Sequence, residues 1–244
     1  MAAEYFVPDW PVPSGVAALQ SLRGGGGSQA PYDSLNLGDH VGDALSDVAA
    51  NRRYLTAILP GEPQWLTQVH GVTVAELSGS RSERPVEADA ALSRTPGVVC
   101  AVLTADCLPV LLCDRAGSVV AAVHAGWRGL CNGVIEASLA RMAVPGREIL
   151  AWLGPAIGPE SFEVGDEVRA AFMAKDSAAA SAFQAKGDVK WLADLYLLAR
   201  QRLEAEGVTA IYGGGECTFS DRARYFSFRR DGVTGRQASA IWLR

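Results

Sequence analysis

The stretch from Cys107 to His124 reads CLPVLLCDRAGSVVAAVH, and its pattern is that of a β-hairpin. Two apolar runs flank a short Arg-Ala-Gly segment, which is typical of a turn between two antiparallel strands. With Cys113 opposite Ser118, the same register places Cys107 directly across from His124. Directly opposed residues project from one face, with Cβ atoms about 4.5–5.5 Å apart. The hairpin therefore predicts a thiol and an imidazole side by side at its open end.

The sequence around this hairpin predicts one mixed α/β domain. Alternating or fully apolar runs indicate strands at 65–70, 72–77, 97–104, 108–114, 119–124, 148–153, 210–213 and 238–242. Helical spacing indicates helices at 43–59, 126–142, 165–174 and 192–206. Residues 1–15 contain three prolines and are expected to form an extended lead-in. Because no repeat or long linker is visible, we expect a single domain over 1–244 around one mixed sheet flanked by helices.

Composition excludes several classes of function. Of the 244 residues, 49% are hydrophobic and 20% are charged, which is an ordinary globular balance. The net charge is −5 and no basic cluster stands out, so neither nucleic acid nor an anionic membrane is an expected partner. The N-terminal residues lack the pattern of a signal peptide, so a cytoplasmic location is expected. The five cysteines are an odd number in a chain of this size, which disfavours a disulfide framework.

A third metal ligand is predicted from the segment Gln68-Val69-His70-Gly71, which ends a strand. One thiolate and two imidazoles, from Cys107, His124 and His70, suit zinc. Three protein ligands leave a fourth position open for water, as in catalytic zinc sites. Copper or iron also accept these ligand types.

The pair Cys107 and His124 has a second interpretation as a nucleophile and its base. A thiolate activated by a neighbouring imidazole attacks acyl carbons. His70 favours the metal interpretation, because a dyad has no evident need of a second imidazole.

An anion site is predicted where the second strand of the hairpin turns into a helix, at His124-Ala125-Gly126-Trp127-Arg128-Gly129. Free N–H groups at a helix start attract anions, and Arg128 adds a bidentate donor for phosphate or carboxylate. A solvated arginine at a helix start is the plain alternative.

Several motifs, in the same order along residues 20–243, resemble the YfiH-type laccase-domain family. Members of this family are also called multicopper polyphenol oxidase-like proteins and are described as purine nucleoside phosphorylases. The matching stretches include Arg23-Gly24-Gly25-Gly26-Gly27-Ser28, Asn36-Leu37-Gly38-Asp39-His40-Val41-Gly42-Asp43, Asn51-Arg52, Gln68-Val69-His70-Gly71, Ala88-Asp89-Ala90, Thr104-Ala105-Asp106-Cys107, His124-Ala125-Gly126-Trp127-Arg128-Gly129, Gly154-Pro155-Ala156-Ile157-Gly158-Pro159, Cys217-Thr218 and Ser227-Phe228-Arg229-Arg230-Asp231-Gly232.

The resemblance implies an α/β fold related to bacterial toxins with a Cys–His pair, and a zinc site at His70, Cys107 and His124. It also implies phosphorolysis of adenosine, inosine and methylthioadenosine, and deamination of adenosine. Purine nucleosides and inorganic phosphate are then the expected partners. Two alternatives remain open, a Cys–His amidase or hydrolase acting on cell-wall precursors and a copper-dependent polyphenol oxidase.

Roles for individual residues follow from these reactions. In deamination a carboxylate must move protons, and Asp106 is the first candidate, ahead of Asp89 and Glu163. In phosphorolysis the phosphate needs cationic donors, and Arg128 and Arg23 are candidates. Asn36 is similar to a family residue near the active site and is expected to bind substrate hydroxyls. His40 is placed near the site but not on the metal.

The chain departs from the family pattern at several positions. Family members often carry cysteines near the positions of Ser161 and Ser220, and tyrosines where Phe162 and Phe228 stand. Without those thiols no second metal cluster is expected, which weakens the interpretation as a copper oxidase. The sequence gives no oligomeric state.

Overall fold

A computed structural model describes residues 5–79, 85–187 and 189–244. At its centre is the predicted hairpin, formed by β8 (Leu108–Asp114) and β9 (Val120–Ala125). Its register differs by two residues from the predicted one, because Cys113 pairs with Val120 and Pro109 pairs with His124. The direct pairing of Cys107 with His124 is therefore wrong. A shift of two leaves side chains on the same face, so the two residues remain diagonal neighbours.

The turn of the hairpin explains the shift. Four residues separate Asp114 from Val119, to whose carbonyl its N–H donates, whereas the predicted register leaves only two residues between Asp114 and Gly117. The Asp114 carboxylate also accepts hydrogen bonds from the backbone N–H groups of Ser118 and Val119 at 2.7 and 3.0 Å. These contacts draw Ser118 into the turn. The sequence pattern does not reveal this role, because it shows only a small polar residue at that position.

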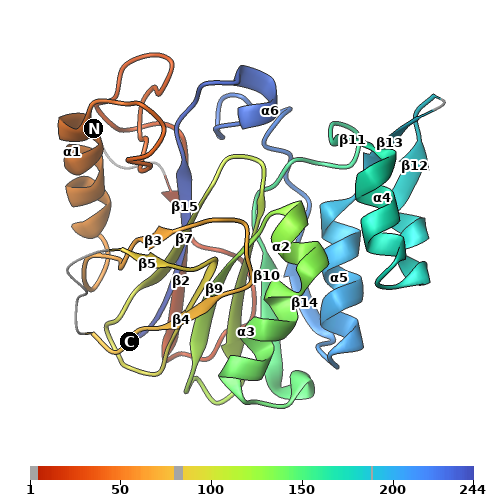
Figure 1. Cartoon of the computed structure of the whole chain (residues 1–244). Helices are drawn as coiled ribbons and strands as arrows, with labels where there is room; N and C mark the ends of the chain where they lie inside the picture. Colours follow the sequence, from red (N-terminus) through yellow and green to blue (C-terminus); the bar gives the residue numbers. More distant parts are fainter. Residues whose placement is uncertain (1–4, 80–84, 188) are drawn as a thin grey trace.

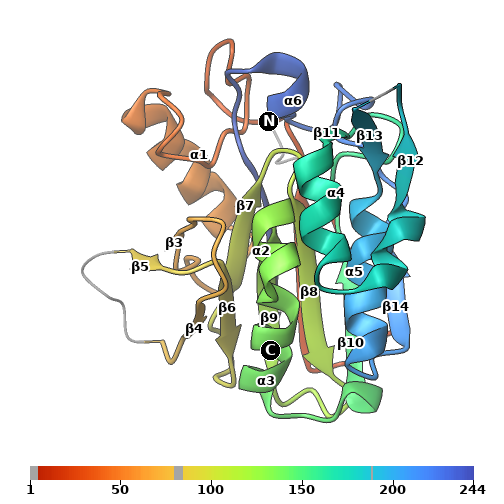
Figure 2. The ribbon, with the colours of Figure 1, turned by 45° about the vertical axis from the view of Figure 1, so that its right-hand side comes forward.

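Two stacked sheets replace the single mixed sheet that the sequence predicted (Figures 1 and 2). The larger sheet has the order β14-β10-β8-β9-β6-β4 and includes parallel and antiparallel pairs. The smaller, antiparallel sheet has the order β1-β2-β15-β7. The further strands of both sheets are β14 (Ala210–Gly213), β10 (Ile149–Leu153), β6 (Ala90–Ser93), β4 (Val74–Glu76), β1 (Tyr5–Phe6), β2 (Val16–Ser21), β15 (Gln237–Leu243) and β7 (Cys100–Thr104).

Apolar side chains fill the space between the two sheets. Leu111 and Val120 from the larger sheet and Val102 and Ile241 from the smaller one belong to one buried cluster. Burial of each such side chain contributes about 1.5–3 kcal/mol to folding. This core fixes the hairpin rigidly, and so it fixes the end at which Cys107 and His124 lie.

Helices cover the outer faces of both sheets. α2 (Trp127–Asn132) and α3 (Val134–Met142) cover the larger sheet, α5 (Leu195–Ala205) packs beside α3, and α1 (Leu45–Thr56) packs on the smaller sheet. The predicted helix over 126–142 is broken at Gly133, whose φ of 99° is a left-handed conformation that glycine adopts without strain. No helix in the described ranges is long and apolar enough to cross a lipid bilayer.

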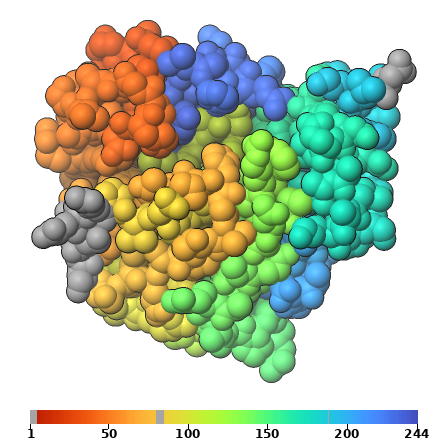
Figure 3. Space-filling view, viewed as in Figure 1, coloured from red at the N-terminus to blue at the C-terminus, as the bar shows by residue number. Residues whose placement is uncertain are grey.

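The remaining elements are short and peripheral. β3 (Leu66–Thr67) pairs with β5 (Val86–Glu87), and β11 (Glu163–Gly165), β13 (Lys190–Ala193) and β12 (Phe183–Ala185) form a small sheet against which α4 (Asp166–Met173) packs. The short helices are η1 (Gly146–Glu148), η2 (Ser177–Ala182) and α6 (Phe228–Asp231). The space-filling view shows the C-terminal segment around α6 lying against the N-terminal segment at one end of the molecule (Figure 3).

Candidate metal centre

The donor atoms of His70, Cys107 and His124 lie within 4.8 Å of one another. His124 is on β9, Cys107 directly precedes β8, and His70 comes from the loop after β3. The Sγ of Cys107 is 3.8 Å from Nε2 of His70, and the two imidazole rings lie edge to face with centroids 4.8 Å apart. The structure thus brings the three predicted metal ligands together.

A buried carboxylate, Asp89, holds the loop that carries His70. Its Oδ2 accepts the backbone N–H of Gly71 at 2.6 Å, and its Oδ1 accepts that of His70 at 2.8 Å. A longer bond of 3.3 Å comes from the N–H of Val69. His70 has a φ of 62°, an uncommon conformation for a residue with a side chain. These bonds stabilise a strained turn, and they explain why the predicted strand at 65–70 contains only two residues.

Asp89 also orients the second imidazole. Its Oδ1 lies 2.8 Å from Nδ1 of His124, and because an ionised carboxylate only accepts, Nδ1 carries the proton. Nε2 of His124 is thereby left to bind a metal or the thiol. One fully buried side chain therefore positions two of the three ligands, as outer-shell carboxylates do in many metal sites.

The thiol and the imidazole polarise each other. Burial raises the pKa of Cys107, but the charge of His124 and hydrogen bonds from both imidazoles outweigh it and lower the pKa to about 6. Burial lowers the pKa of His124, but the Cys107 thiolate and Asp89 raise it to about 9. Both shifts favour a thiolate beside an imidazolium in the metal-free protein.

Glycine at position 126 makes room for this group. A Cβ there would lie 2.8 Å from Cδ2 of His70 and 3.0 Å from Sγ of Cys107. Gly126 continues the hairpin register opposite Cys107, so its missing side chain leaves space where the three ligands converge.

The donor set fits a metal ion of the zinc type. A thiolate is already favoured, and both imidazoles present a ring nitrogen towards the sulfur, so binding requires the loss of one proton from His124. Copper accepts the same ligands. In the part of the chain that the structure describes, this is the one group of three such residues close enough to share an ion. That gives no support to a cluster of several coppers.

Asp106 lies beside the group, and both of its oxygens have partners. Oδ1 accepts the hydroxyl of Thr218 at 2.6 Å, and Oδ2 accepts the backbone N–H of Arg229 at 2.6 Å. The residue is 9% exposed and has a φ of 92°. Asp106 thus ties the segment after β14 to the loop before Cys107.

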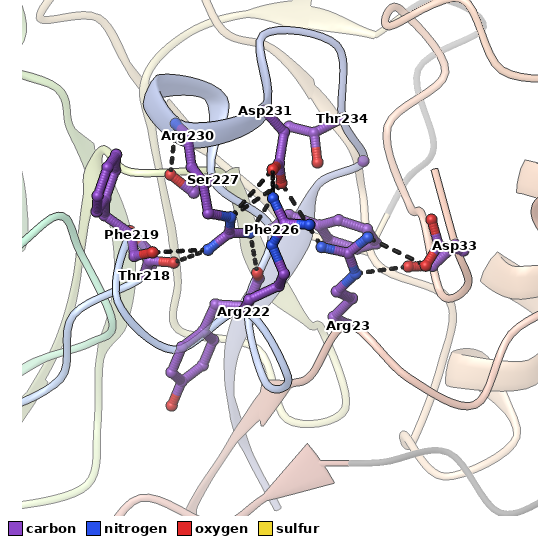
Figure 4. A network of polar contacts seen from close by, with 12 residues as sticks. Arg23, Asp33, Thr218, Phe219, Arg222, Phe226, Ser227, Arg230, Asp231 and Thr234 are labelled. Carbon is purple, nitrogen blue, oxygen red and sulfur yellow. Dashed lines mark hydrogen bonds and ion pairs between the residues drawn. The ribbon is translucent and has the colours of Figure 1, made fainter. Parts of the chain in front are cut away.

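Arg23 is engaged in a network of ion pairs (Figure 4). Its Nε and Nη2 donate to the backbone and carboxylate of Asp33 at 2.7 and 3.1 Å. Its Nη1 lies 3.6 Å from Asp231, which also pairs with Arg222 and Arg230 at 2.8 Å each. The glycine-rich turn after Arg23 is therefore part of a structural contact with the segment around α6.

The other two predicted substrate-binding residues differ in availability. Asn36 is fully buried; its Nδ2 donates to Gly38 and Asp43, and its Oδ1 accepts from the N–H groups of Gly38 and Arg236. Arg128 is exposed, and its guanidinium lies over the ring of Trp127 at 4.4 Å. Within the described residues Arg128 has no ion pair, so it is free to contact an anion.

Arg236 is a residue of this region that the sequence did not reveal. Burial lowers its pKa, while the charges of Cys107 and Asp106, which lie near, raise it. Its Nη1 donates to the carbonyls of Thr234 and Gly235 at 3.0 Å each. A lone arginine after a Gly-Val-Thr-Gly run carries no local signal of this position.

The remaining sequence candidates lie outside the metal group. His40 is exposed, lies 3.5 Å from Asp39 and is not a member of the three-residue metal group. Glu163 pairs with Lys186 at 3.1 Å. Of the four other cysteines, Cys100, Cys113 and Cys131 are buried, and Cys217 is half-buried.

Comparisons with known proteins agree with this architecture. The model of the family described as multi-copper polyphenol oxidoreductase laccase matches residues 17–244. The purine nucleoside phosphorylase YfiH of Escherichia coli is 58% identical over 245 residues and 99% of both chains. A purine nucleoside phosphorylase of Pseudomonas aeruginosa is 57% identical over 240 residues and 98% of both chains.

Solved structures agree in the fold as well as in the sequence. A crystal structure of a Neisseria meningitidis protein superposes with a TM-score of 0.94 at 49% identity, over 98% of both chains. YlmD from Geobacillus stearothermophilus superposes with a TM-score of 0.85 at 30% identity, over 95% of this chain and 93% of that one. The mixed α/β fold and the resemblance inferred from the motifs are both confirmed. The chain therefore belongs to the YfiH-type laccase-domain family.

Proposed function

We propose that this protein is a zinc-dependent purine nucleoside phosphorylase that acts on adenosine, inosine and methylthioadenosine and also deaminates adenosine. The observation that carries the proposal is the group of His70, Cys107 and His124, whose donor atoms lie within 4.8 Å of one another. Its two relatives at 57% and 58% identity are named purine nucleoside phosphorylases, which supports the same class of reaction.

His70, Cys107 and His124 would hold the ion, with Asp89 orienting the imidazole of His124 and holding the backbone of His70. A bound zinc ion would supply a Lewis acid and a water molecule of lowered pKa. The same donors accept copper, and metal analysis of the protein purified without added metal distinguishes the two.

In phosphorolysis a phosphate oxygen attacks C1′ of the ribose as the C1′–N9 bond breaks. The electron pair of that bond passes to the purine, which then takes up a proton. We retain Arg128 as a donor to the anionic reactant, because its guanidinium is exposed and has no ion pair within the described residues. We omit Arg23 and Asn36, whose polar groups already contact protein atoms.

In deamination water adds to C6 of adenosine and ammonia leaves, so one proton must move from the water to the leaving nitrogen. We propose Asp106 for this transfer, because it adjoins Cys107 in the chain and remains 9% exposed. Asp106→Asn is expected to reduce deamination sharply at full metal content. Because its oxygens also bind Thr218 and Arg229, unfolding must be measured beside turnover.

The test is turnover of inosine with and without phosphate, followed by release of the base, in the metal-loaded protein and in variants. His70→Ala and Cys107→Ser are expected to lose both metal and phosphate-dependent turnover. Cys217→Ser is the matched control, because Cys217 is also half-buried but belongs to no three-ligand group in the described ranges. Full zinc content in His70→Ala, or base release that ignores phosphate, would contradict the proposal.

A hydrolase that uses Cys107 as a nucleophile is the second candidate, favoured by the lowered pKa of its thiol. The two candidates respond in opposite ways to metal. Removal of the ion by a chelator abolishes phosphorolysis under our proposal, whereas a thiol-dependent amidase would gain activity because the thiolate is released.

A further inference from the structure

A cavity of about 260 Å³ lies between the loop at His40 and the segment from Phe228 to Arg236. The metal group reaches this segment through Asp106, which adjoins Cys107 and accepts the N–H of Arg229 at 2.6 Å. Arg236 lines the cavity and interacts electrostatically with Cys107 and Asp106, so the cavity is close to the proposed reaction centre.

The cavity contains a guanidinium with donors to spare. Only Nη1 of Arg236 is bound to protein, at the carbonyls of Thr234 and Gly235. Its Nε and Nη2 have no hydrogen-bond partner among the described residues, and the side chain forms no ion pair there. Arg23 differs in this respect, because its Nε and Nη2 both donate to Asp33.

Thr234, another residue that lines the cavity, has a buried hydroxyl without a partner in the described structure. Thr234 is 1% exposed, and its Oγ1 has no hydrogen-bond partner in the described structure. Leaving a buried polar group unpaired costs about 1–3 kcal/mol, so such groups commonly mark a place where a ligand binds. The imidazole of His40 also lines the cavity, and partial burial together with the charge of Arg236 lowers its pKa.

We propose that this cavity binds the inorganic phosphate that attacks the nucleoside, with Arg236 and Thr234 as further donors beside Arg128. The assignment deepens the proposed function and rests on it. A cation with free planar donors, a hydroxyl and an imidazole are the groups that bind phosphate in proteins. The exposed ring of Phe228 lies at the mouth of the cavity, 5.9 Å from the guanidinium carbon of Arg236.

Asn36 gains a role in this arrangement as a positioning residue. Its buried Oδ1 accepts the backbone N–H of Arg236 at 2.9 Å. The loop that follows packs on the stem of Arg236, where a Cβ at Gly38 would lie 2.8 Å from Cγ of the arginine. The Asn-Leu-Gly motif thus holds the proposed phosphate ligand without touching phosphate.

The decisive variant is Thr234→Val in the zinc-loaded protein. Because the hydroxyl has no protein partner, its loss is expected to leave the melting temperature unchanged or higher. Phosphate KM is expected to rise about tenfold, the effect of one hydrogen bond to a charged group. The KM for inosine should stay within about twofold. Tyr54→Phe is the matched control, because it removes another buried, unpartnered hydroxyl, on α1 and away from the cavity.

A second variant and a second measurement make the test independent of turnover. Arg236→Lys keeps the charge but loses the planar fork, and is also expected to raise phosphate KM about tenfold. Phosphate alone should raise the melting temperature of the wild-type zinc protein, and both variants should weaken that rise.

The possible outcomes distinguish a failure of the proposed phosphate site from a failure of the proposed function. Stabilisation by phosphate that both variants weaken, without phosphorolysis in the wild type, would support the cavity and overturn the proposed function. Phosphorolysis with unchanged phosphate KM in both variants would overturn the assignment of the cavity as the phosphate site, but not the proposed function. A rise in inosine KM in place of phosphate KM, or an absence of both stabilisation and turnover in the wild type, would also overturn the assignment.

Discussion

Replacing Asp89 by asparagine changes one atom of a carboxylate that contacts two of the three proposed metal ligands. Oδ1 serves His124 and the N–H of His70, while Oδ2 serves the N–H groups of Gly71 and Val69. The amide of the variant has one oxygen. Whichever way it turns, its NH₂ group faces N–H donors that it cannot satisfy.

The cheaper orientation keeps the oxygen at the position of Oδ1, because His124 then retains its tautomer. The amide nitrogen meets the N–H of Gly71, which lies 2.6 Å from Oδ2 in the wild type, and that of Val69. Each buried N–H left unpaired costs about 1–3 kcal/mol. We expect a loss of about 3 kcal/mol in the free energy of unfolding, or about 6–12 °C in melting temperature.

The metal affinity should fall about 10–100-fold, the usual effect of removing an outer-shell partner. The measurement is competition with a chelator, beside thermal unfolding of the metal-free protein. Asp114→Asn is the matched control, because Asp114 is also buried and accepts three hydrogen bonds, but at the opposite end of the hairpin. It should bind metal normally and lose less stability, because the new amide can donate to the Ser118 hydroxyl while its oxygen keeps both backbone bonds.

Equal metal affinity in the two variants would refute this reasoning, because it would make Asp89 a purely structural carboxylate. A loss of affinity in both variants would also refute it. In that case general loosening of the hairpin, rather than orientation of the imidazoles, would control the metal.

Two other substitutions test the surroundings. Gly126→Ala places a Cβ 2.8 Å from Cδ2 of His70, so metal affinity by chelator competition should fall about tenfold or more, while Gly27→Ala, which has nothing within 4 Å, should have no effect. Burial raises the pKa of Asp231, but the bond to Arg230 and the neighbouring guanidiniums outweigh it and keep the pKa below its ordinary value of 3.8. The carboxylate therefore stabilises the fold above that value and loses its effect as pH falls through the folded pKa. At pH 7, Asp231→Asn should lower the free energy of unfolding by about 3 kcal/mol. The variant should also lose less stability than the wild type as the pH falls, and an equal loss would contradict a stabilising role of these ion pairs.

The meeting of His70, Cys107 and His124 could be predicted because the signal is local. The hairpin is contiguous in sequence, and its two-residue periodicity places Cys107 and His124 on one face even where the register is shifted by two. His70 was predicted as the third ligand because it ends a strand and is followed by a glycine. Each of these patterns lies within a few residues of the side chain concerned.

The supporting residues could not be predicted in the same way, because their partners are distant in sequence. The bonds from Asp89 to its partners span 18 to 35 residues, and that from Asn36 to Arg236 spans 200. Arg23 in its glycine-rich turn has the composition of a phosphate loop, yet Asp33 and Asp231 bind its guanidinium. Composition shows which groups a residue can bind, but not which partner the fold supplies.

The second sheet was missed for a related reason. β2 reads VAALQS, without alternation, and all six residues are buried. Its main partner is β15, near the other end of the chain, so no local pattern pairs the two segments. One sheet was the simplest arrangement of the strands that periodicity indicated.

The position of β15 between β2 and β7 has a consequence for synthesis on the ribosome. Gln20 meets Ser239 across 219 residues, so β2 emerges early and waits for its partner until nearly the whole chain is made. Such distant pairing is closed late and slowly. Arg236 directly precedes β15, so a nascent chain that lacks this segment carries the metal ligands without the proposed phosphate donor. Phosphate-dependent turnover would then report that the chain had finished folding, whereas metal binding alone would not.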